Sequence, residues 1–220
     1  MDELLPRLLT PALVNLLVAA AALVLFNDWR IRLAALAVQY AAAAILVTQA
    51  VAVEVAFAKF VVGGLVAAIL VITAAQFNFG RPAVTLPSPT PDPEVRPWRL
   101  EVPTGFPFRL MATLMFVIAA IYLASQPNMV LPGLQVVLAI NIASYLLMAL
   151  GLLNLGLSEE PMRAGTGLLT LMTGFEIFYA AVEPSLAIIA LLAAAEFGVA
   201  LAVSYLTVLQ HSHPSETVSG

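Results

Sequence analysis

Seven long apolar segments constrain this 220-residue chain more than any other feature. A helix needs about 20 mostly apolar residues to span the hydrocarbon core of a membrane. Only 10% of the residues are charged, whereas soluble domains carry about 25%. We therefore predict an all-α, polytopic integral membrane protein with about seven transmembrane helices in a 3+4 arrangement. The predicted spans are residues 8–26, 32–49, 51–76, 108–126, 130–156, 162–182 and 185–209.

The two groups of spans are separated by one long hydrophilic stretch, residues 80–107. It holds eight of the fifteen prolines, which disfavour the interior of a helix or a central strand. We interpret it as an extended cytoplasmic linker between a three-helix module (1–79) and a four-helix module (108–210), followed by a polar tail (211–220). The N-terminus lacks an A-x-A cleavage signal, so residues 8–26 are interpreted as the first span and not as a removed signal peptide.

The positions of the arginines predict the orientation. With the N-terminus outside, seven of the eight arginines fall on the inner side, which matches the positive-inside rule. The prediction is a multi-pass protein of the inner or plasma membrane with a cytoplasmic C-terminus. The inner arginines are Arg30, Arg32, Arg81, Arg96, Arg99, Arg109 and Arg163, and the outer one is Arg7.

Several kinds of site are excluded or disfavoured. The absence of cysteine excludes disulfides, thiolate metal sites and iron–sulfur ligation. The basic residues are too few and scattered for a nucleic-acid surface, and no phosphate loop or nucleophile elbow is present. We expect no cofactor, no metal and no catalytic residue. The pair His211 and His213 could bind a metal, but a solvated tail is the preferred interpretation.

Glycines are expected where helices pack closely. This interpretation covers the pair Gly63 and Gly64 and the set Gly165, Gly167 and Gly174. A π-bulge or hinge at Gly63-Gly64 is the alternative, because such bulges gather at functional sites.

Three ionisable residues lie deep inside predicted spans: Lys59, Glu176 and Glu196. A charge at the bilayer centre costs about 2.5–3.5 kcal/mol on insertion scales. At about 1.5 Å per residue, all three lie about 12–18 Å from the outer ends of their helices, in one layer near the middle of the membrane. A lateral chain of proton-exchanging sites needs this arrangement. The alternative is a structural Lys–Glu bridge, although one lysine cannot neutralise two carboxylates.

Other polar residues are weaker candidates. Glu54 and Glu183 lie near the outer interface and are interpreted as solvated ends. Glu54, Tyr145 and Tyr205 are kept as secondary site residues. Polar side chains on span faces are interpreted as interhelical hydrogen-bonding groups or as supports for a water wire. They are Asn15, Gln39, Tyr40, Asn141, Tyr145, Asn154 and Tyr205.

From Asn141 onward the chain resembles a known family. The helices containing "GFE" (174–176) and "AAAE" (193–196), the latter followed by Leu201-Ala202, are similar to the K subunit (chain 4L) of respiratory complex I and to the C subunit of Mrp-type sodium/proton antiporters. The resemblance covers residues 141–209. It implies a three-helix unit in which Glu176 and Glu196 are the intramembrane glutamates. The turn between the last two helices is shorter than in that family.

Residues 8–76 resemble, more weakly, the J-like subunits of Mrp antiporters and membrane-bound hydrogenases. The stretch "VEVAFAKFVVGGL" is similar to a run in their third helix, but Lys59 stands where that family has an acidic residue. The resemblance implies a fusion of a J-like and a K-like module, which stand side by side in the families, with helix 108–126 as an added connector.

The functional prediction is a non-redox membrane subunit of a complex I-like, Mrp-like or hydrogenase-like assembly. It would contribute to proton or cation translocation through Glu176, Glu196 and Lys59. Its partners would be the lipid bilayer and other membrane subunits, including antiporter-like ones. The alternatives are a non-catalytic membrane scaffold and a self-contained secondary transporter. The second alternative is disfavoured because no inverted repeat is evident.

Overall fold

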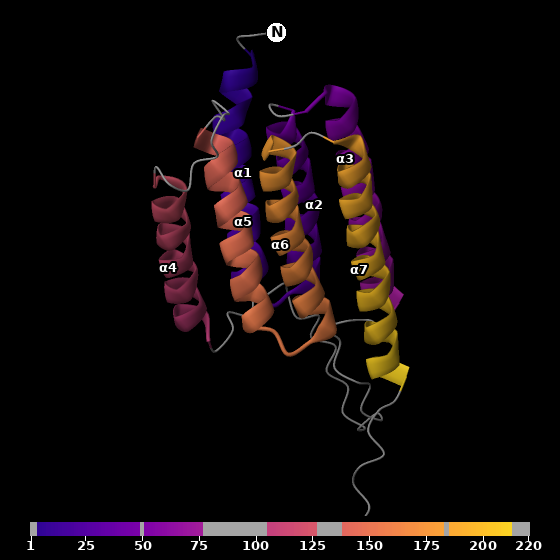
Figure 1. Ribbon diagram of the computed structural model, residues 1–220. Coiled ribbons are helices and arrows are strands. Elements are labelled where there is room, and N and C mark those ends of the chain that lie inside the picture. The colour runs from indigo at the N-terminus through magenta and orange to yellow at the C-terminus, as the bar shows by residue number, and fades with distance from the viewer. Residues whose placement is uncertain (1–3, 49–50, 77–104, 127–137, 183–184, 213–220) are drawn as a thin grey trace, which may run out of the picture.

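The computed structural model describes residues 4–48, 51–76, 105–126, 138–182 and 185–212, and these residues form seven α-helices (Figure 1). The all-α prediction is confirmed, and most predicted helix ends lie within a few residues of the observed ones. The helices are α1 (Leu4–Leu25), α2 (Trp29–Val47), α3 (Val53–Gln76), α4 (Phe106–Ala124), α5 (Leu138–Gly156), α6 (Pro161–Val182) and α7 (Leu186–Ser212).

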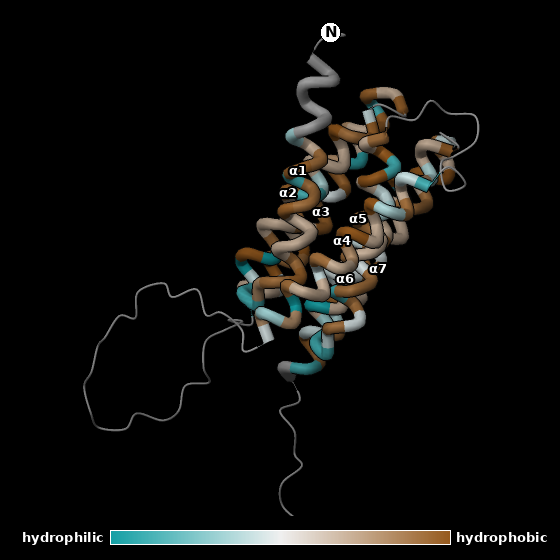
Figure 2. The backbone as a smooth tube through the Cα atoms, turned by 90° about the vertical axis from the view of Figure 1, so that its left-hand side faces the viewer, coloured by the Kyte–Doolittle hydropathy of each residue, from teal (hydrophilic) through white to brown (hydrophobic). Residues whose placement is uncertain are grey.

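Six of these helices, α2 to α7, are long and apolar enough to cross a membrane, and α1 contains a shorter apolar run, Pro11–Leu25. Hydrophobic residues dominate along the helices (Figure 2). The outer faces of α3, α4 and α7 expose large apolar side chains such as Phe57, Met111 and Leu191. Such surfaces are stable in lipid and not in water, so the chain is a polytopic membrane protein.

One predicted segment falls largely, and another partly, outside the described residues. Of the linker 80–107, only the last residues are described, and α4 begins at Phe106. The span predicted for 130–156 is described only from Leu138, where α5 begins. The side chain of His211 and the whole of His213 also lie outside the described residues, as does Glu183.

The helices pack in two rows (Figure 1). In the first row α1 packs on α2 and α2 on α3, and in the second α5 packs on α6 and α6 on α7. Across the rows α1 contacts α5, α2 contacts α6, and α3 contacts α7. α4 lies at the edge, beside α5 and α1. The apolar core between the rows includes Leu16, Leu46, Leu146, Leu150 and Ile177.

Hydrogen bonds between helix ends fix the directions. Arg109, at the start of α4, donates to Val24 O at the end of α1 (3.2 Å). Arg32, at the start of α2, donates to Arg163 O at the start of α6 (3.3 Å). Asn141, early in α5, donates to Ala124 O at the end of α4 (2.7 Å). Facing helices therefore run in the same direction: α1 with α5, α2 with α6, and α3 with α7.

Glycines allow the closest helix contacts, as predicted for the set on α6. A Cβ added at Gly167 would lie 2.7 Å from Leu155 N, and one at Gly174 would lie 2.8 Å from Leu147 Cβ, both on α5. A Cβ at Gly165 would lie 2.3 Å from a methyl group of Val203 on α7. These glycines hold α6 tightly between its two neighbours.

The glycine pair on α3 behaves differently at its two positions. A Cβ at Gly63 would lie 2.5 Å from Tyr40 Cγ, so the tyrosine ring of α2 rests directly on this glycine. A Cβ at Gly64 would meet no atom within 4 Å. The packing prediction is thus confirmed for Gly63 only. The alternative of a π-bulge is wrong, because α3 is a regular α-helix throughout. The absence of a Cβ at Gly63 is enough to let the Tyr40 ring approach, so the backbone does not need to distort.

Candidate functional site

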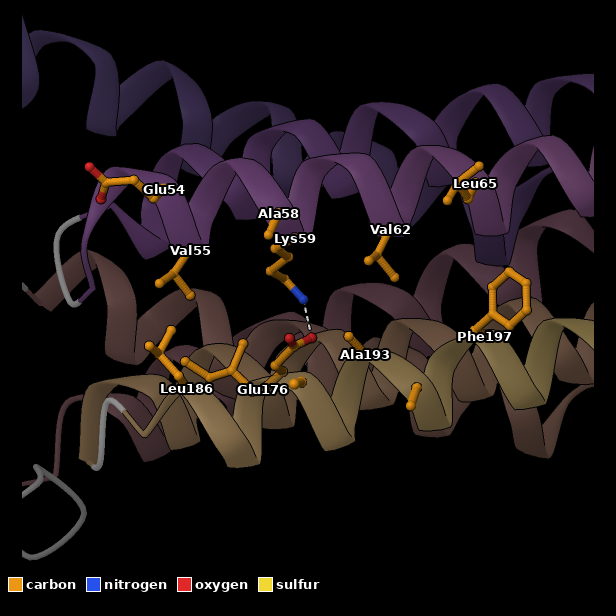
Figure 3. Close-up of a pocket in the computed structure, with 13 residues that line it drawn as sticks. Glu54, Val55, Ala58, Lys59, Val62, Leu65, Glu176, Leu186, Ala193 and Phe197 are labelled. Atoms are coloured by element: carbon orange, nitrogen blue, oxygen red, sulfur yellow. Dashed lines mark hydrogen bonds and ion pairs between the residues drawn. The ribbon is translucent and has the colours of Figure 1, made fainter.

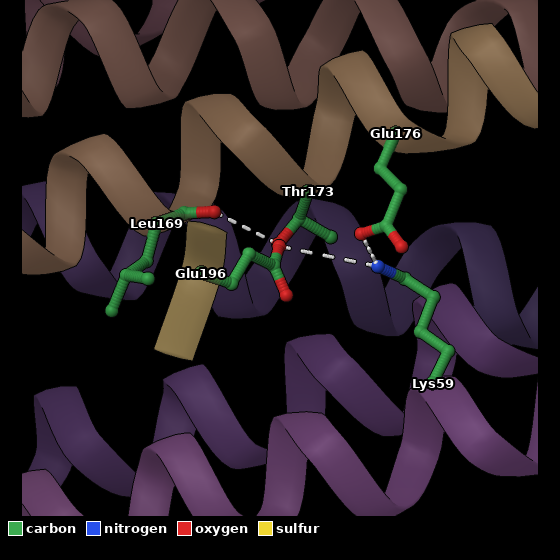
Figure 4. Close-up of polar contacts among 5 residues, drawn as sticks. All are labelled: Lys59, Leu169, Thr173, Glu176 and Glu196. Carbon is green, nitrogen blue, oxygen red and sulfur yellow. Dashed lines mark hydrogen bonds and ion pairs between the residues drawn. The ribbon is translucent and has the colours of Figure 1, made fainter. Parts of the chain in front are cut away.

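The three buried charges predicted from the sequence meet between α3, α6 and α7 (Figure 4). Lys59, Glu176 and Glu196 are 4%, 2% and 2% exposed. The ammonium of Lys59 forms an ion pair with Glu176 Oε2, and Lys59 Nζ lies 4.0 Å from Glu196 Oε1. The expectations that they occupy one layer and that the helices of the two halves touch there are both confirmed. We call these residues the charge triad.

A ladder of threonines on α6 leads away from the charge triad. Thr166, Thr170, Thr173 and Glu176 follow one another at intervals of four, three and three residues, which keeps them on one face of a helix. All three threonines are at most 1% exposed. Their hydroxyls donate to backbone carbonyls three or four residues earlier. The ladder therefore forms a continuous polar stripe from the charge triad to the start of α6.

The threonine ladder touches polar groups on the neighbouring helices. Thr170 Oγ1 lies 3.3 Å from Gln39 Oε1 on α2. At the start of α6, Thr166 Oγ1 accepts hydrogen bonds from Arg32 on α2 and from Asn154 Nδ2 on α5 (3.4 Å). Buried polar groups in lipid need such partners. The polar stripe consequently lies between α6 and α2.

Thr173 connects the ladder to Glu196. Its Oγ1 lies 2.8 Å from Leu169 O and 3.2 Å from Glu196 Oε1 (Figure 4). A hydroxyl carries one proton and can donate it to one of these acceptors at a time. If Glu196 is ionised, Thr173 donates to the carboxylate. If Glu196 is protonated, the carboxylic acid donates to Thr173, which then donates to Leu169 O. Both protonation states fit the same heavy-atom positions.

Two further polar groups of this layer have unused hydrogen-bonding capacity. Glu176 Oε1 and the Tyr40 hydroxyl are buried and have no hydrogen-bond partner among the described residues. Tyr40 is 1% exposed and its ring packs on Gly63. Buried polar groups in proteins usually have a hydrogen-bond partner, so a water molecule beside either group would complete its hydrogen bonding.

A cavity of about 600 Å³ lies between α3 and α7, next to the charge triad (Figure 3). Lys59 and Glu176 point towards each other inside it, Glu54 lies at one end, and the remaining lining is apolar, including Leu65, Ala193 and Phe197. The predicted secondary residue Glu54 is thus near the charge triad, on the side opposite to the threonine ladder.

The other predicted polar residues have different surroundings. Tyr145 packs edge-on against Phe178, with ring centroids 6.2 Å apart, so it lies between α5 and α6. Tyr205 is 64% exposed on α7, nine residues beyond Glu196, and does not face the charge triad. Asn141 and Asn154 make interhelical hydrogen bonds, as predicted. Asn15 is exposed.

The threonine ladder and the buried Arg32 were missed in the prediction from sequence. The spacing of Thr166, Thr170, Thr173 and Glu176 was the available signal. Comparisons with protein-family models, curated proteins and solved structures give no match.

Proposed function

We propose that the chain carries protons, or a small cation, through the charge triad as a membrane subunit of a complex I-like, Mrp-like or hydrogenase-like assembly. The observation that carries this proposal is that two carboxylates, Glu176 and Glu196, share one ammonium, Lys59, in a buried site.

The charge balance of the triad favours a bound proton or cation. With all three groups ionised, one ammonium and two carboxylates leave a net charge of −1. A net charge near the bilayer centre costs about 2.5–3.5 kcal/mol or more, so a proton or a cation on the second carboxylate is strongly favoured. A purely structural bridge needs one carboxylate only. The second carboxylate therefore supports an ion-exchange role.

The hydrogen bonds support Glu196 as the carboxylate that exchanges the proton. Glu176 contacts the ammonium directly, whereas Glu196 lies farther from it and next to Thr173. The hydroxyl of Thr173 can serve either protonation state of Glu196 by turning its own proton. We therefore assign Glu196 as the group that exchanges the proton. The Lys59–Glu176 pair sets the electrostatic environment in which Glu196 gains or loses it.

The surroundings open on two sides of the triad, along a polar stripe on one side and into a mostly apolar cavity on the other. The threonine ladder extends towards the ends of the helices that carry Arg32 and Arg163. The cavity between α3 and α7 extends from Lys59 towards Glu54. A site that exchanges ions between two membrane faces needs access of this kind from both directions.

Membership in a larger assembly rests on the resemblance of residues 141–209 to K-like subunits and of residues 8–76 to J-like subunits. In those families the two modules are neighbours. In this chain the corresponding helices α1–α3 and α5–α7 lie side by side. The sign change at Lys59 departs from the J-like family, so its role follows from its contacts here. The scaffold alternative is favoured only by the Lys59–Glu176 pair, which by itself would be a sufficient interhelical bridge.

The direct test is an infrared pH titration of the purified chain in lipid nanodiscs. A protonated carboxyl group absorbs separately from a carboxylate, so exchange at Glu196 gives a band that disappears as the pH rises. Glu196→Gln should remove this band. Thr173→Val should shift its midpoint, because hydrogen bonds to both protonation states are lost and the one to the charged form is the stronger. Glu159→Gln, which changes an exposed carboxylate, is the control. A wild-type spectrum without a titrating buried carboxyl would refute the proposal.

A second test addresses translocation in the native membrane. Glu196→Gln keeps the size of the side chain and removes its titration. We expect an assembled complex with reduced proton movement. Normal proton movement with intact assembly would leave the scaffold alternative.

A further inference from the structure

Three arginines converge at the end of the bundle where α1, α2, α4 and α6 meet. Arg32 comes from α2, Arg109 from α4 and Arg163 from α6. Arg109 Nη1 lies 3.3 Å from Asn27 Oδ1, and Arg163 Nη2 donates to the same oxygen. Arg32 Nη2 lies 3.3 Å from the backbone oxygen of Arg163. The side-chain amide of Asn27 thus links Arg109 to Arg163, and the backbone carbonyl of Arg163 links it to Arg32. We call the three arginines the arginine cluster.

The arginine cluster has no carboxylate partner in the described part of the chain. Every acceptor that the structure gives these side chains is a neutral oxygen, from Asn27, Val24, Arg163 or Thr166. The ion pairs within 4.0 Å among the described residues involve Lys59 only. Glu160 is exposed and attracts Arg32 and Arg163 electrostatically, without an ion pair within 4.0 Å. Three positive charges consequently repel one another in a small volume.

The cluster also has unsatisfied donors. Arg32 is 3% exposed, and its Nε is buried and has no acceptor among the described residues; the same holds for Arg163 Nε. A buried charge without a partner is strongly unfavourable. The guanidinium group has five donors in a planar fork that matches the oxygens of a phosphate. A phosphate bound at the exposed side of the cluster would offset the charge and accept hydrogen bonds from the donors that remain accessible.

The location suits a phosphate group. Arg32, Arg109 and Arg163 all lie in the first turn of their helices, so the cluster lies at the level where a spanning helix meets the lipid headgroups. Helix N-termini carry a partial positive charge that favours anions. Arg109 and Arg163 are half-buried and Asn27 is exposed, so these two arginines are accessible, whereas the buried Arg32 adds its charge from inside the bundle. Basic pockets between transmembrane helices bind anionic headgroups.

We propose that Arg32, Arg109 and Arg163 bind a phosphate group, presented by an anionic phospholipid or by free phosphate. This site is separate from the charge triad and does not depend on its function.

The test compares two variants of the full chain. Arg109→Gln combined with Arg163→Gln removes two of the three charges and leaves the buried Arg32 in place. Arg30→Gln is the matched control, because Arg30 lies at the same end of the bundle, is exposed and stacks over the Trp29 ring at 5.3 Å. Both proteins are placed in nanodiscs of phosphatidylcholine with a minor fraction of phosphatidylglycerol. Native mass spectrometry of the released protein then measures retained phosphatidylglycerol.

We expect the double variant to retain phosphatidylglycerol about tenfold less than the wild type, since charge-assisted hydrogen bonds are lost. The control variant should match the wild type. In a second arm, inorganic phosphate is compared with chloride at equal ionic strength on lipid-free protein in detergent. Phosphate-dependent thermal stabilisation without phosphatidylglycerol retention would support the same site with free phosphate as its ligand.

Two outcomes would overturn the proposal. One is a wild-type protein that shows neither a preference for phosphatidylglycerol over phosphatidylcholine nor a response to phosphate. The other is an equal loss in Arg30→Gln and in the double variant. The wild-type measurement stands even if the double variant fails to fold, and its phosphatidylglycerol retention should fall as salt rises.

Discussion

Replacing the members of the Lys59–Glu176 pair one at a time and together tests how the charge triad is balanced. Removing one partner of a buried ion pair costs about 3–5 kcal/mol, because the other charge is left unpaired. Lys59→Met leaves two carboxylates without a cation and should approach the upper end of this range. Glu176→Leu leaves Lys59 with Glu196, whose Oε1 is 4.0 Å from Nζ. Its cost should therefore be smaller, about half that of Lys59→Met.

The double variant Lys59→Met/Glu176→Leu should cost little, within about 1 kcal/mol of the wild type, because no unpaired charge remains once Glu196 holds a proton. With these single and double costs, the coupling energy between the two positions should be about 6.5 kcal/mol, well above the value for independent sites. The unpaired carboxyl in Lys59→Met can take up a proton, and that uptake becomes easier by about 1.36 kcal/mol per pH unit as the pH falls. Lys59→Met should therefore regain stability in acid.

The assay is reversible unfolding in mixed detergent micelles, measured by circular dichroism for the wild type, both single variants and the double variant at two pH values. Glu159→Gln provides a control at an exposed carboxylate. Additive effects, with the double variant as unstable as the sum of the singles, would show that the pair is not formed. An unchanged stability of Lys59→Met across the two pH values would contradict the argument about the unpaired carboxyl.

Two further predictions follow from the glycine contacts and from the arginine positions. Gly63→Ala should destabilise the protein by about 1–3 kcal/mol, as overpacked sites do, because its Cβ would lie 2.5 Å from Tyr40 Cγ. Gly64→Ala should be neutral or slightly stabilising in the same unfolding assay. Equal effects of the two substitutions would contradict the contact between Gly63 and Tyr40. In this cysteine-free chain, Ser125→Cys should react with an impermeant thiol reagent added outside intact cells, whereas Glu159→Cys should react only after lysis. The reverse pattern would overturn the predicted orientation.

Much of the fold was predictable because a helix that crosses lipid must have a minimum apolar length. Short polar breaks such as Asn27-Asp28, between the end of α1 at Leu25 and the start of α2 at Trp29, limit where the helices can end. The common layer of Lys59, Glu176 and Glu196 also followed from counting residues along helices of known rise. Lengths and depths are therefore encoded in the local sequence of a membrane protein.

The rotation of each helix about its axis was not predictable in the same way. In water an apolar stripe marks the buried face, but α7 is apolar on every side, so Tyr205 gave no sign that it points outwards. The threonines of α6 were overlooked because a threonine can satisfy its own hydroxyl on the preceding turn. Only the packing of α2 and α7 against α6 reveals that Thr170 and Thr173 also face Gln39 and Glu196.

The parallel alignment of the two rows depends on whether the number of helices that precede the second row is odd or even. A unit with an odd number of membrane crossings ends on the face opposite to the one where it began. A second unit of three helices that follows directly would run upside down relative to the first. In a membrane, α4 would supply one extra crossing between them, although it lies at the edge of the bundle and buries only Thr113, Ala120 and Ala124. Without α4, the N-terminal end of α6 would lie on the opposite face from that of α2. Glu176 would then lie at a different depth from Lys59.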